Sequence, residues 1–323
     1  MITMRQRAPA LAWLLVALSL LPVSLPAAFG QEPPSEKPAT DAPKAAPPPE
    51  DDDPATAPDE ETRKRRLLKR LLPPGQLTPE QQEEAKRLSE IAAEQGTDPT
   101  ALVGRLETIY QYNTQTSGSR VNTVLERAVL TLRGNWLMRV DVPELWTDPK
   151  LPRTSDQSGV SDLFARFANR VFSTPGYAVL AGMDFTFPTA ARPSLGTGKY
   201  TIAPGVATSR VFPELASLTY GILQHQVSVG GDPSRKDVSI SRLGLTWNTL
   251  WGERWWTQVQ AQAQIDWTRN NRSSMALEFE GGWSITKEWR VWVHPGVGLW
   301  GRDVFGNYDW IMQAGVRRML PSF

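Results

Sequence analysis

The sequence predicts an all-β fold: a single antiparallel, up-and-down transmembrane β-barrel of about 12 strands, with a short helical and Pro-rich N-terminal extension. Residues 255–267 read WWTQVQAQAQIDW, in which the even positions from 258 to 266 are polar and the odd ones apolar. About 10 alternating residues between aromatic ends suit a strand that crosses a bilayer. Ten of the 13 Trp residues lie between positions 247 and 310, which is typical of an aromatic girdle. A soluble β-domain with cross-strand Trp pairs is the alternative.

Composition narrows the classes of protein. The chain has 323 residues, a formal net charge of +1 and no cysteine. These values exclude a disulfide framework and a Cys-based zinc site, and they give no indication of nucleic-acid binding. Beyond the N-terminus there is no run of about 20 apolar residues, which excludes a helical membrane bundle while leaving a barrel open.

Residues 1–30 predict an export signal. A basic start precedes an apolar core at 11–21, and small residues at 28–30 mark a cleavage site. An uncleaved anchor is the alternative, but the core is short and proline follows it. We therefore expect the outer membrane of a Gram-negative bacterium, with the N-terminus in the periplasm after cleavage.

Two further segments precede the barrel. Nine of the 30 residues in 31–60 are Pro and the segment is acidic, which predicts a disordered linker. Residues 61–107 predict a basic segment and then a periplasmic helical hairpin, with Thr78 capping the first helix and Asp98 starting the second. The hairpin either stands alone, plugs the mouth of the barrel or docks a partner.

The barrel itself is predicted over 108–323, with its first strand beginning at Thr108. The other strands are predicted at 121–132, 135–143, 161–171, 177–187, 200–211, 217–228, 238–249, 255–267, 274–285, 290–301 and 308–320. Short turns alternate with mostly longer loops, as in outer-membrane barrels, and an even strand number places both termini in the periplasm. The terminal Phe323 resembles the end that the barrel assembly machinery reads, although Arg317 and Arg318 interrupt the apolar alternation of the last strand.

Several blocks of sequence resemble a known family. They read FPTA at 187–190, LGTGKY at 195–200, QHQVSVGGD at 224–232, DW at 266–267 and VG at 297–298. In this order they resemble the outer-membrane barrels named after the MetA pathway of phenol degradation.

That resemblance covers roughly 108–323 and implies a porin-like or transporter-like barrel that passes small organic compounds. It implies no catalytic residues. It places Gly196, Gly198 and Lys199 in a motif turn.

Strand parity assigns polar side chains to the lumen. If the odd positions of 255–267 face lipid, the same rule places charges of other strands inside, whereas each would cost about 2–4 kcal/mol on the lipid side at the midplane. They either orient a solute in a water-filled path or pair with one another and brace a narrow interior. The candidate path residues are Arg139, Asp141, Arg166, Arg170, Asp184, Gln260, Gln262, Asp266, Glu278, Glu280, Arg290 and His294.

No catalytic, cofactor or metal site is predicted. His225 and Ser228 are three positions apart on one strand, so their side chains point to opposite faces. Glu278 and Glu280 share a face about 7 Å apart, which is compatible with carboxylate chemistry and also usual on a solvated strand. Residues 196–199 lack the pattern of a phosphate-binding loop, and the two His residues, in distant strands, give no metal-ligand set.

We therefore expect a porin-like or transporter-like barrel that gives small solutes passive or gated passage, in contact with outer-membrane lipid and without enzymatic activity. The alternative is an anchoring barrel whose extension at 31–107 binds a periplasmic partner or the cell wall. A soluble all-β binding protein is a third hypothesis.

Overall fold

The computed structural model describes residues 77–148, 156–304 and 306–320. The predicted signal peptide, the linker, the basic segment and Phe323 lie outside these residues. The described part contains the helix α3 (Pro79–Gln95) and the short helical turns η2 (Pro193–Leu195) and η3 (Pro213–Leu215). Its strands are β1 (Arg105–Thr114), β2 (Arg120–Leu132), β3 (Trp136–Asp148), β4 (Gln157–Val160), β5 (Leu163–Thr174), β6 (Tyr177–Phe187), β7 (Lys199–Phe212), β8 (Ser217–Gly231), β9 (Ser239–Trp251), β10 (Trp255–Asp266), β11 (Arg272–Ser284), β12 (Trp289–Trp300) and β13 (Trp310–Met319).

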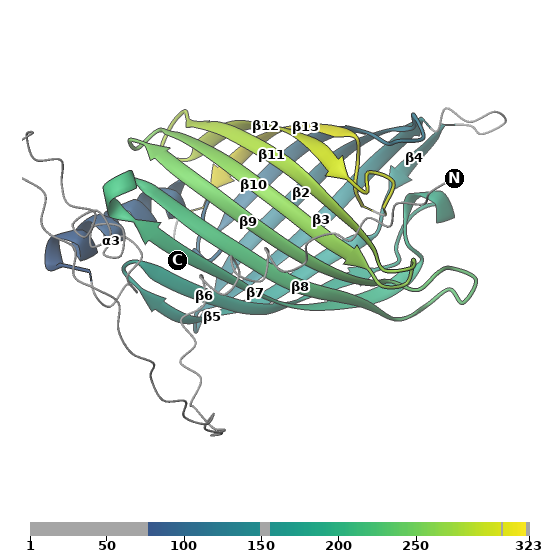
Figure 1. The fold of residues 1–323 in the computed structure, drawn as a ribbon, viewed down its shortest axis with the longest axis horizontal. Coiled ribbons are helices and arrows are strands. Elements are labelled where there is room, and N and C mark those ends of the chain that lie inside the picture. Colours follow the sequence, from purple (N-terminus) through teal and green to yellow (C-terminus); the bar gives the residue numbers. More distant parts are fainter. Residues whose placement is uncertain (1–76, 149–155, 305, 321–323) are drawn as a thin grey trace, which may run out of the picture. The chain divides into compact units, whose positions relative to one another are not determined.

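Twelve of these strands close into an antiparallel barrel, which confirms the predicted fold class (Figure 1). Each strand pairs with its neighbour in the chain, and β13 pairs with β1 to complete the ring. The strand β4 lies outside the ring because it pairs only with the outer end of β3. The prediction of a plain loop over 144–160 was therefore wrong: β3 is longer than expected and β4 folds back on it.

The two ends of the barrel differ, as predicted. We call one the short-turn end: the strands turn there at 133–135, 175–176, 213–216, 252–254 and 285–288, and β1 begins and β13 ends there. The opposite long-loop end carries the connections at 188–198, 232–238 and 301–309, together with those after β1, β4 and β10. Gly134 and Asn135, with φ of 72° and 64°, make the tight turn between β2 and β3, a conformation that glycine and asparagine adopt readily.

The outer surface of the barrel is mostly apolar and carries Trp at both ends. Trp255 and Trp283 are exposed near the short-turn end, where their rings stack at 5.3 Å, and Trp267 and Trp310 are exposed near the long-loop end. Trp rings at these two levels match the aromatic belts of a membrane barrel. No helix among the described residues is long and apolar enough to cross a membrane.

Two Trp residues do not belong to these belts. Trp256 and Trp292 are 0% and 5% exposed and point into the barrel, where they pack against α3. The interpretation of the Trp-rich region as girdle alone was therefore wrong for these two. Each ring covers a glycine on the neighbouring strand, Gly282 under Trp256 and Gly315 under Trp292.

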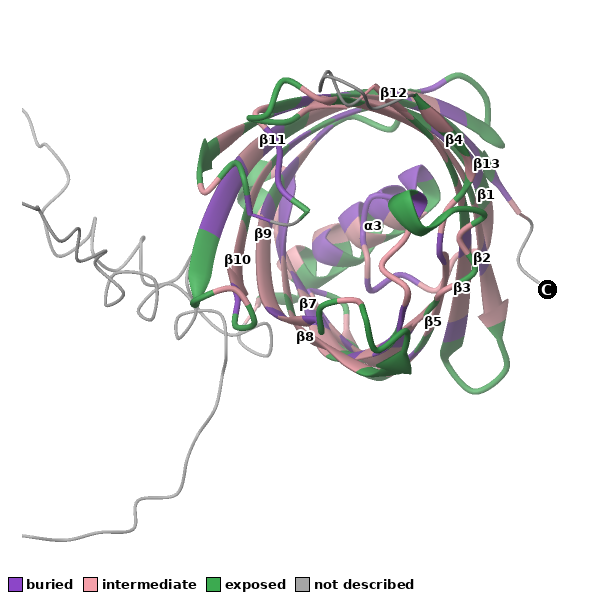
Figure 2. Ribbon diagram, turned by 90° about the vertical axis from the view of Figure 1, so that its right-hand side faces the viewer, coloured by how far each residue is buried: buried purple, intermediate pink, exposed green. Residues whose placement is uncertain are grey.

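The helix α3 lies inside the ring of strands at the short-turn end (Figures 1 and 2). It begins with a capping box, in which Thr78 and Gln81 exchange side-chain-to-backbone hydrogen bonds, and it ends at Gly96 with φ of 70°. Its apolar face, made of Ala85, Leu88, Ile91 and Ala92, packs against Ile109, Val211, Leu218, Leu250, Trp256 and Trp292 of the inner wall.

A second helix is absent from the described residues. Residues 97–104 form turns that lead directly to β1, which starts at Arg105 and not at Thr108. Asp98 does act as a local cap, since its Oδ1 accepts hydrogen bonds from the backbone N–H and the hydroxyl of Thr100, both at 2.8 Å. No helix follows this cap, and Leu102 packs instead against apolar residues of β5, β6 and β7.

Replacing Gly282 with valine is expected to displace Trp256 and to destabilise the folded protein by about 1–3 kcal/mol, the usual effect of overpacking. A Cβ at Gly282 would lie 1.9 Å from the Trp256 ring. The adjacent Gly281→Val is the control, because nothing lies within 4 Å of its added Cβ. Urea unfolding in detergent, followed by Trp fluorescence, measures both. Equal destabilisation by the two variants would contradict this packing.

Candidate solute pathway

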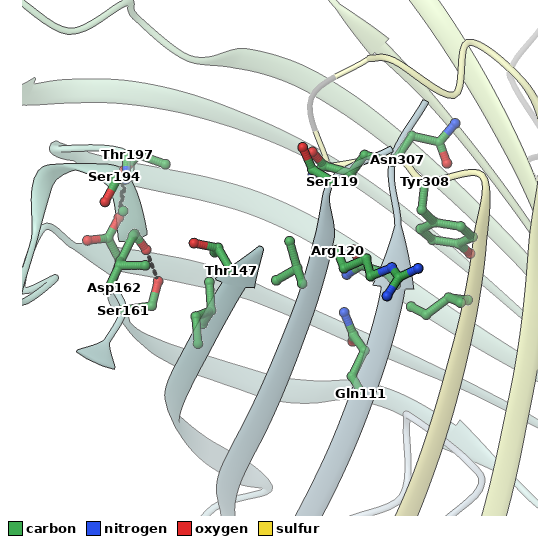
Figure 3. A pocket seen from close by; sticks show the side chains of 18 of the residues that line it. Gln111, Ser119, Arg120, Thr147, Ser161, Asp162, Ser194, Thr197, Asn307 and Tyr308 are labelled. Atoms are coloured by element: carbon green, nitrogen blue, oxygen red, sulfur yellow. Dashed lines mark hydrogen bonds between the residues drawn. The ribbon is translucent and has the colours of Figure 1, made fainter. Parts of the chain in front are cut away.

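A cavity of about 1320 Å³ occupies the long-loop half of the barrel (Figure 3). Its wall is rich in amide and hydroxyl groups, which donate and accept hydrogen bonds without carrying charge. Among the lining residues are Gln111, Asn113, Ser119, Thr147, Gln262, Asn307, Tyr308 and Gln313. This composition suits a space filled with water or with a polar solute.

The connection between β6 and β7 forms one side of the cavity mouth and is fixed by Asp162. This carboxylate accepts hydrogen bonds from the backbone N–H and hydroxyl of Thr197, at 2.6 and 2.8 Å, and from the N–H of Ala190 at 3.3 Å. A Cβ at Gly196 would lie 2.3 Å from Asp162 Oδ1, so this set of hydrogen bonds, which we call the Asp162 clasp, requires glycine there.

The other two residues of the motif turn lie next to this clasp. Gly198 has φ of 71°. Lys199, the first residue of β7, is buried and pairs with Asp237 of the β8–β9 connection at 2.8 Å. The turn therefore fixes loops at the mouth.

The helix α3 and residues 97–104 lie inside the short-turn half of the barrel. The helix contacts the turns around it: Gln81 donates to Glu214 at 2.6 Å, Ser89 to the carbonyl of Pro175 at 3.1 Å, and Gln95 to the carbonyl of Glu253 at 3.3 Å.

The segment after the helix is held in the same way. The hydroxyls of Thr100 and Ser209 lie 2.8 Å apart, and Asn248 donates to Thr97 at 2.9 Å. Burial raises the pKa of Asp98 within this segment. Together these contacts hold α3 and residues 97–104 inside the end of the barrel opposite the cavity.

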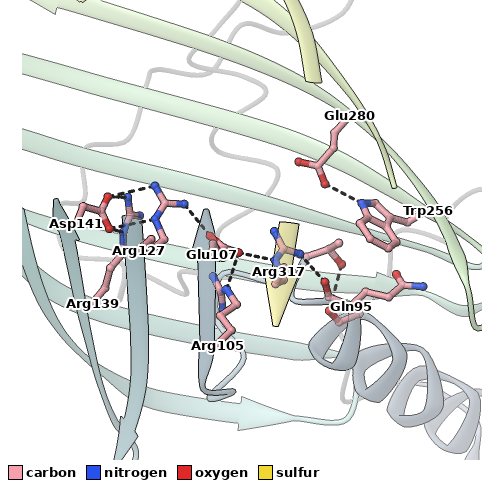
Figure 4. Close-up of polar contacts among 11 residues, drawn as sticks. Gln95, Arg105, Glu107, Arg127, Arg139, Asp141, Trp256, Glu280 and Arg317 are labelled. Carbon is pink, nitrogen blue, oxygen red and sulfur yellow. Dashed lines mark hydrogen bonds and ion pairs between the residues drawn. The ribbon is translucent and has the colours of Figure 1, made fainter. Parts of the chain in front are cut away.

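A row of charged side chains crosses the inner wall beside α3 and residues 97–104, which together we call the plug (Figure 4). Strand register places Arg317, Glu107, Arg127 and Asp141 directly opposite one another on β13, β1, β2 and β3. Arg127 bridges the two carboxylates, at 3.1 Å from Glu107 and 3.0 Å from Asp141. Glu107 also contacts Arg317, and at 3.0 Å Arg105.

The candidates Arg139 and Asp141 belong to this row, since Arg139 Nε donates to Asp141 Oδ1 at 2.7 Å. Arg290 lies at the other end of the row, on β12 opposite Arg317. Sequence reasoning missed Glu107, Arg127 and Arg317. Parity within the predicted strands was sufficient to find Arg127 and Arg317, whereas Glu107 fell outside the predicted first strand by one residue.

A second cluster brings together Glu278, Glu280 and His294. The ring of His294 lies between the carboxylates, with Nε2 2.6 Å from Glu278 and Nδ1 3.3 Å from Glu280. Gln262 donates to Glu278 at 3.1 Å, and Tyr308 also donates to it. Trp256 donates to Glu280 at 2.7 Å. The cluster therefore links the floor of the cavity to the residues that hold α3.

The remaining candidates are more dispersed. Arg166 and Asp184 form a bidentate ion pair, in which the two hydrogen bonds measure 2.6 and 2.8 Å. Asp266 is fully buried and accepts hydrogen bonds from Thr268 and Arg269 at the end of β10. Arg170 and Gln260 are half-buried and occupy positions of their strands that face the interior of the barrel. Most of the charged candidates thus pair with one another, which is the bracing alternative, while Gln262 and Glu278 also line the cavity.

Among the described residues, no group of His, Cys, Asp and Glu has the arrangement of a metal site. His225 and Ser228 do not contact each other: His225 lies 2.9 Å from Ser241, and Ser228 donates to Asp237 at 3.2 Å.

Neither a protein-family model nor a curated protein matches this chain. Solved structures do. An outer-membrane channel from Pseudomonas putida F1 has a TM-score of 0.53 and 11% sequence identity, over 68% of this chain and 96% of that one. The NanC porin has a TM-score of 0.50 and 10% identity, over 67% of this chain and 100% of that one. At such low identity the likeness shows the fold, which is that of outer-membrane β-barrels.

Proposed function

We propose that this protein is a gated outer-membrane channel for small solutes. The observation that carries the proposal is the division of the lumen: a polar cavity of about 1320 Å³ lies at the long-loop end, and α3 with residues 97–104 is bound inside the short-turn end. Solutes enter the cavity, and passage through the whole barrel requires α3 to detach from the inner wall. The fold shared with a porin and a channel supports this function.

The apolar outer surface with its two Trp belts supports placement of the barrel in lipid. We place the short-turn end and α3 on the periplasmic side, because short turns face the periplasm in bacterial barrels. The export signal predicted at 1–30 fits this orientation.

The resemblance to the MetA-pathway barrels supports small organic compounds among the solutes. Within the lumen, we place the solute path along the candidate residues that border the cavity, Gln262 and Glu278, and past the charged row beside α3 once the helix has moved. Hydrogen-bonding groups that line a path select solutes by their polarity and charge.

Two measurements on the full-length protein in detergent test the proposal. A folded barrel is expected to migrate differently on SDS gels before and after boiling, and in a planar bilayer it is expected to show discrete conductance steps from a mostly closed baseline. Complete aqueous solubility without a gel shift would contradict the membrane barrel. A gel shift without conductance steps, even in a variant with a weakened plug, would contradict the channel.

A further inference from the structure

Two arginines face each other directly on the inner wall. Arg290 on β12 and Arg317 on β13 are cross-strand partners, and they are only 4% and 6% exposed. Like charges directly opposite on neighbouring strands repel, and a guanidinium does not lose its proton in a protein. The pair is therefore a concentration of positive charge that other groups must offset.

The carboxylates of the charged row offset the positive charge of this arginine pair only in part. The row and its flanking residues contain five arginines and two acids: Arg105, Arg127, Arg139, Arg290, Arg317, Glu107 and Asp141. Glu107 and Asp141 are already in contact with four of these guanidiniums. Among the described contacts, none joins Arg290 to a carboxylate. Its Nη1 donates to the carbonyls of Thr286 and Lys287, and its Nε has no hydrogen-bond partner among the described residues.

The C-terminal end of α3 supplies the missing negative charge. Arg317 Nη1 donates to the carbonyl of Gln95, and Glu94 lies within electrostatic range of Arg290. A helix C-terminus carries roughly half a negative elementary charge. Gly96 lets the chain approach, because a Cβ there would lie 2.9 Å from Arg317 Cδ. When α3 leaves, these negative groups leave with it and the two arginines face an open lumen.

We propose that Arg290 and Arg317 form a binding site for a small anion that competes with the C-terminal end of α3 and so favours the open barrel. The inference rests on the proposed function, since it gives the gated pathway a preferred solute class. Two guanidiniums and an unused Nε donor suit the oxygens of a carboxylate, sulfate or phosphate. A ligand that binds only the open state shifts the population toward it.

Sulfate is the probe, and the fraction of time that single channels spend open is the measured quantity. Potassium sulfate is expected to raise this fraction in the wild type. In Arg290→Gln at least tenfold more sulfate should be needed for the same rise, whereas Arg290→Lys, which keeps the charge but loses the guanidinium donors, should need an amount between those of the wild type and Arg290→Gln. Arg318→Gln is the matched control: Arg318 points outward, its side chain is 52% exposed, and it lies 3.7 Å from Glu288. The response of Arg318→Gln to potassium sulfate also shows any general effect of salt on the open fraction.

Equal sulfate responses in the wild type, Arg290→Gln and Arg318→Gln, or no response in any of them, would overturn the anion site. The gel shift on boiling checks that each variant folds. If Arg290→Gln does not fold, the reversal potential of the open wild type in a tenfold KCl gradient decides: preference for chloride supports the site and preference for potassium overturns it. Channels that open but ignore anions refute the site alone, whereas the absence of any conductance refutes the proposed function.

Discussion

Replacing Leu88 with alanine is expected to increase the open-to-closed ratio of the channel about thirtyfold or more. Leu88 is 2% exposed at the centre of the apolar contact between α3 and the inner wall. Truncating a buried leucine costs about 2–5 kcal/mol, and each 1.4 kcal/mol changes an equilibrium tenfold. Because Leu88 loses these contacts when the helix leaves, the cost falls on the closed state. Alanine also preserves the helix itself.

Single-channel recording in a planar bilayer measures this ratio. Glu83→Ala is the control, since Glu83 lies on the exposed side of the same helix and its removal should leave the ratio unchanged. An unchanged ratio in Leu88→Ala, in protein that still shows the gel shift, would mean that the apolar face of α3 does not hold the closed state.

Glu107→Gln is expected to destabilise the folded barrel by about 3–5 kcal/mol, the effect of breaking a buried ion-pair network on one side. Glu107 is 2% exposed and contacts Arg105, Arg127 and Arg317. A neutral amide leaves these guanidiniums facing one another without their shared carboxylate. The free energy of unfolding in urea, measured in detergent, should fall by this amount.

Glu126→Gln is the matched control for that substitution. Glu126 lies on the neighbouring strand β2, is exposed, and accepts a hydrogen bond from Thr108 at 2.8 Å. Glutamine keeps an oxygen that can accept from Thr108, and on the outer face the replacement of Glu126 removes a charge from the lipid or detergent side, so the free energy of unfolding should not fall. Similar losses in the two variants would show that the inner row has no special role in stability.

Alternation at period two made the barrel predictable. Each strand has one face toward the interior and one away from it, so a strand such as β10 shows its type and its orientation in its own residues. Turn residues such as Gly134 limited the strand ends to within a few positions. The register of β4 against β3 carries no comparable signal, because it depends on how a long connection folds back.

The plug was less predictable. Local sequence signals predict the first helix: the capping box at Thr78, the apolar stripe through Leu88 and the terminating Gly96. Whether that stripe faces another helix or a barrel wall depends on contacts distant in sequence. Trp256 shows the same limit: next to Trp255 it reads as part of a girdle, and only the partner Gly282 and the helix above it account for its inward position.

The candidate site was predictable as a set of inner-face residues but not as clusters. Parity placed Glu278, Glu280 and His294 on the inner wall, while their meeting around one imidazole depends on the stagger of β11 and β12. The opposition of Arg290 and Arg317 likewise follows from register, which the sequence alone does not specify.

A disulfide between α3's connecting segment and the wall tests most directly whether this plug gates the barrel. The Thr100 and Ser209 hydroxyls are 2.8 Å apart, so cysteines at both positions can meet the geometry of a disulfide, and the chain has no other cysteine. Only residues 96–99 would then separate the helix from a fixed wall. The oxidised Thr100→Cys, Ser209→Cys protein should lose conductance at least tenfold and regain it on reduction, while either single variant should ignore the oxidant. Equal conductance of the oxidised and reduced forms would contradict gating by α3.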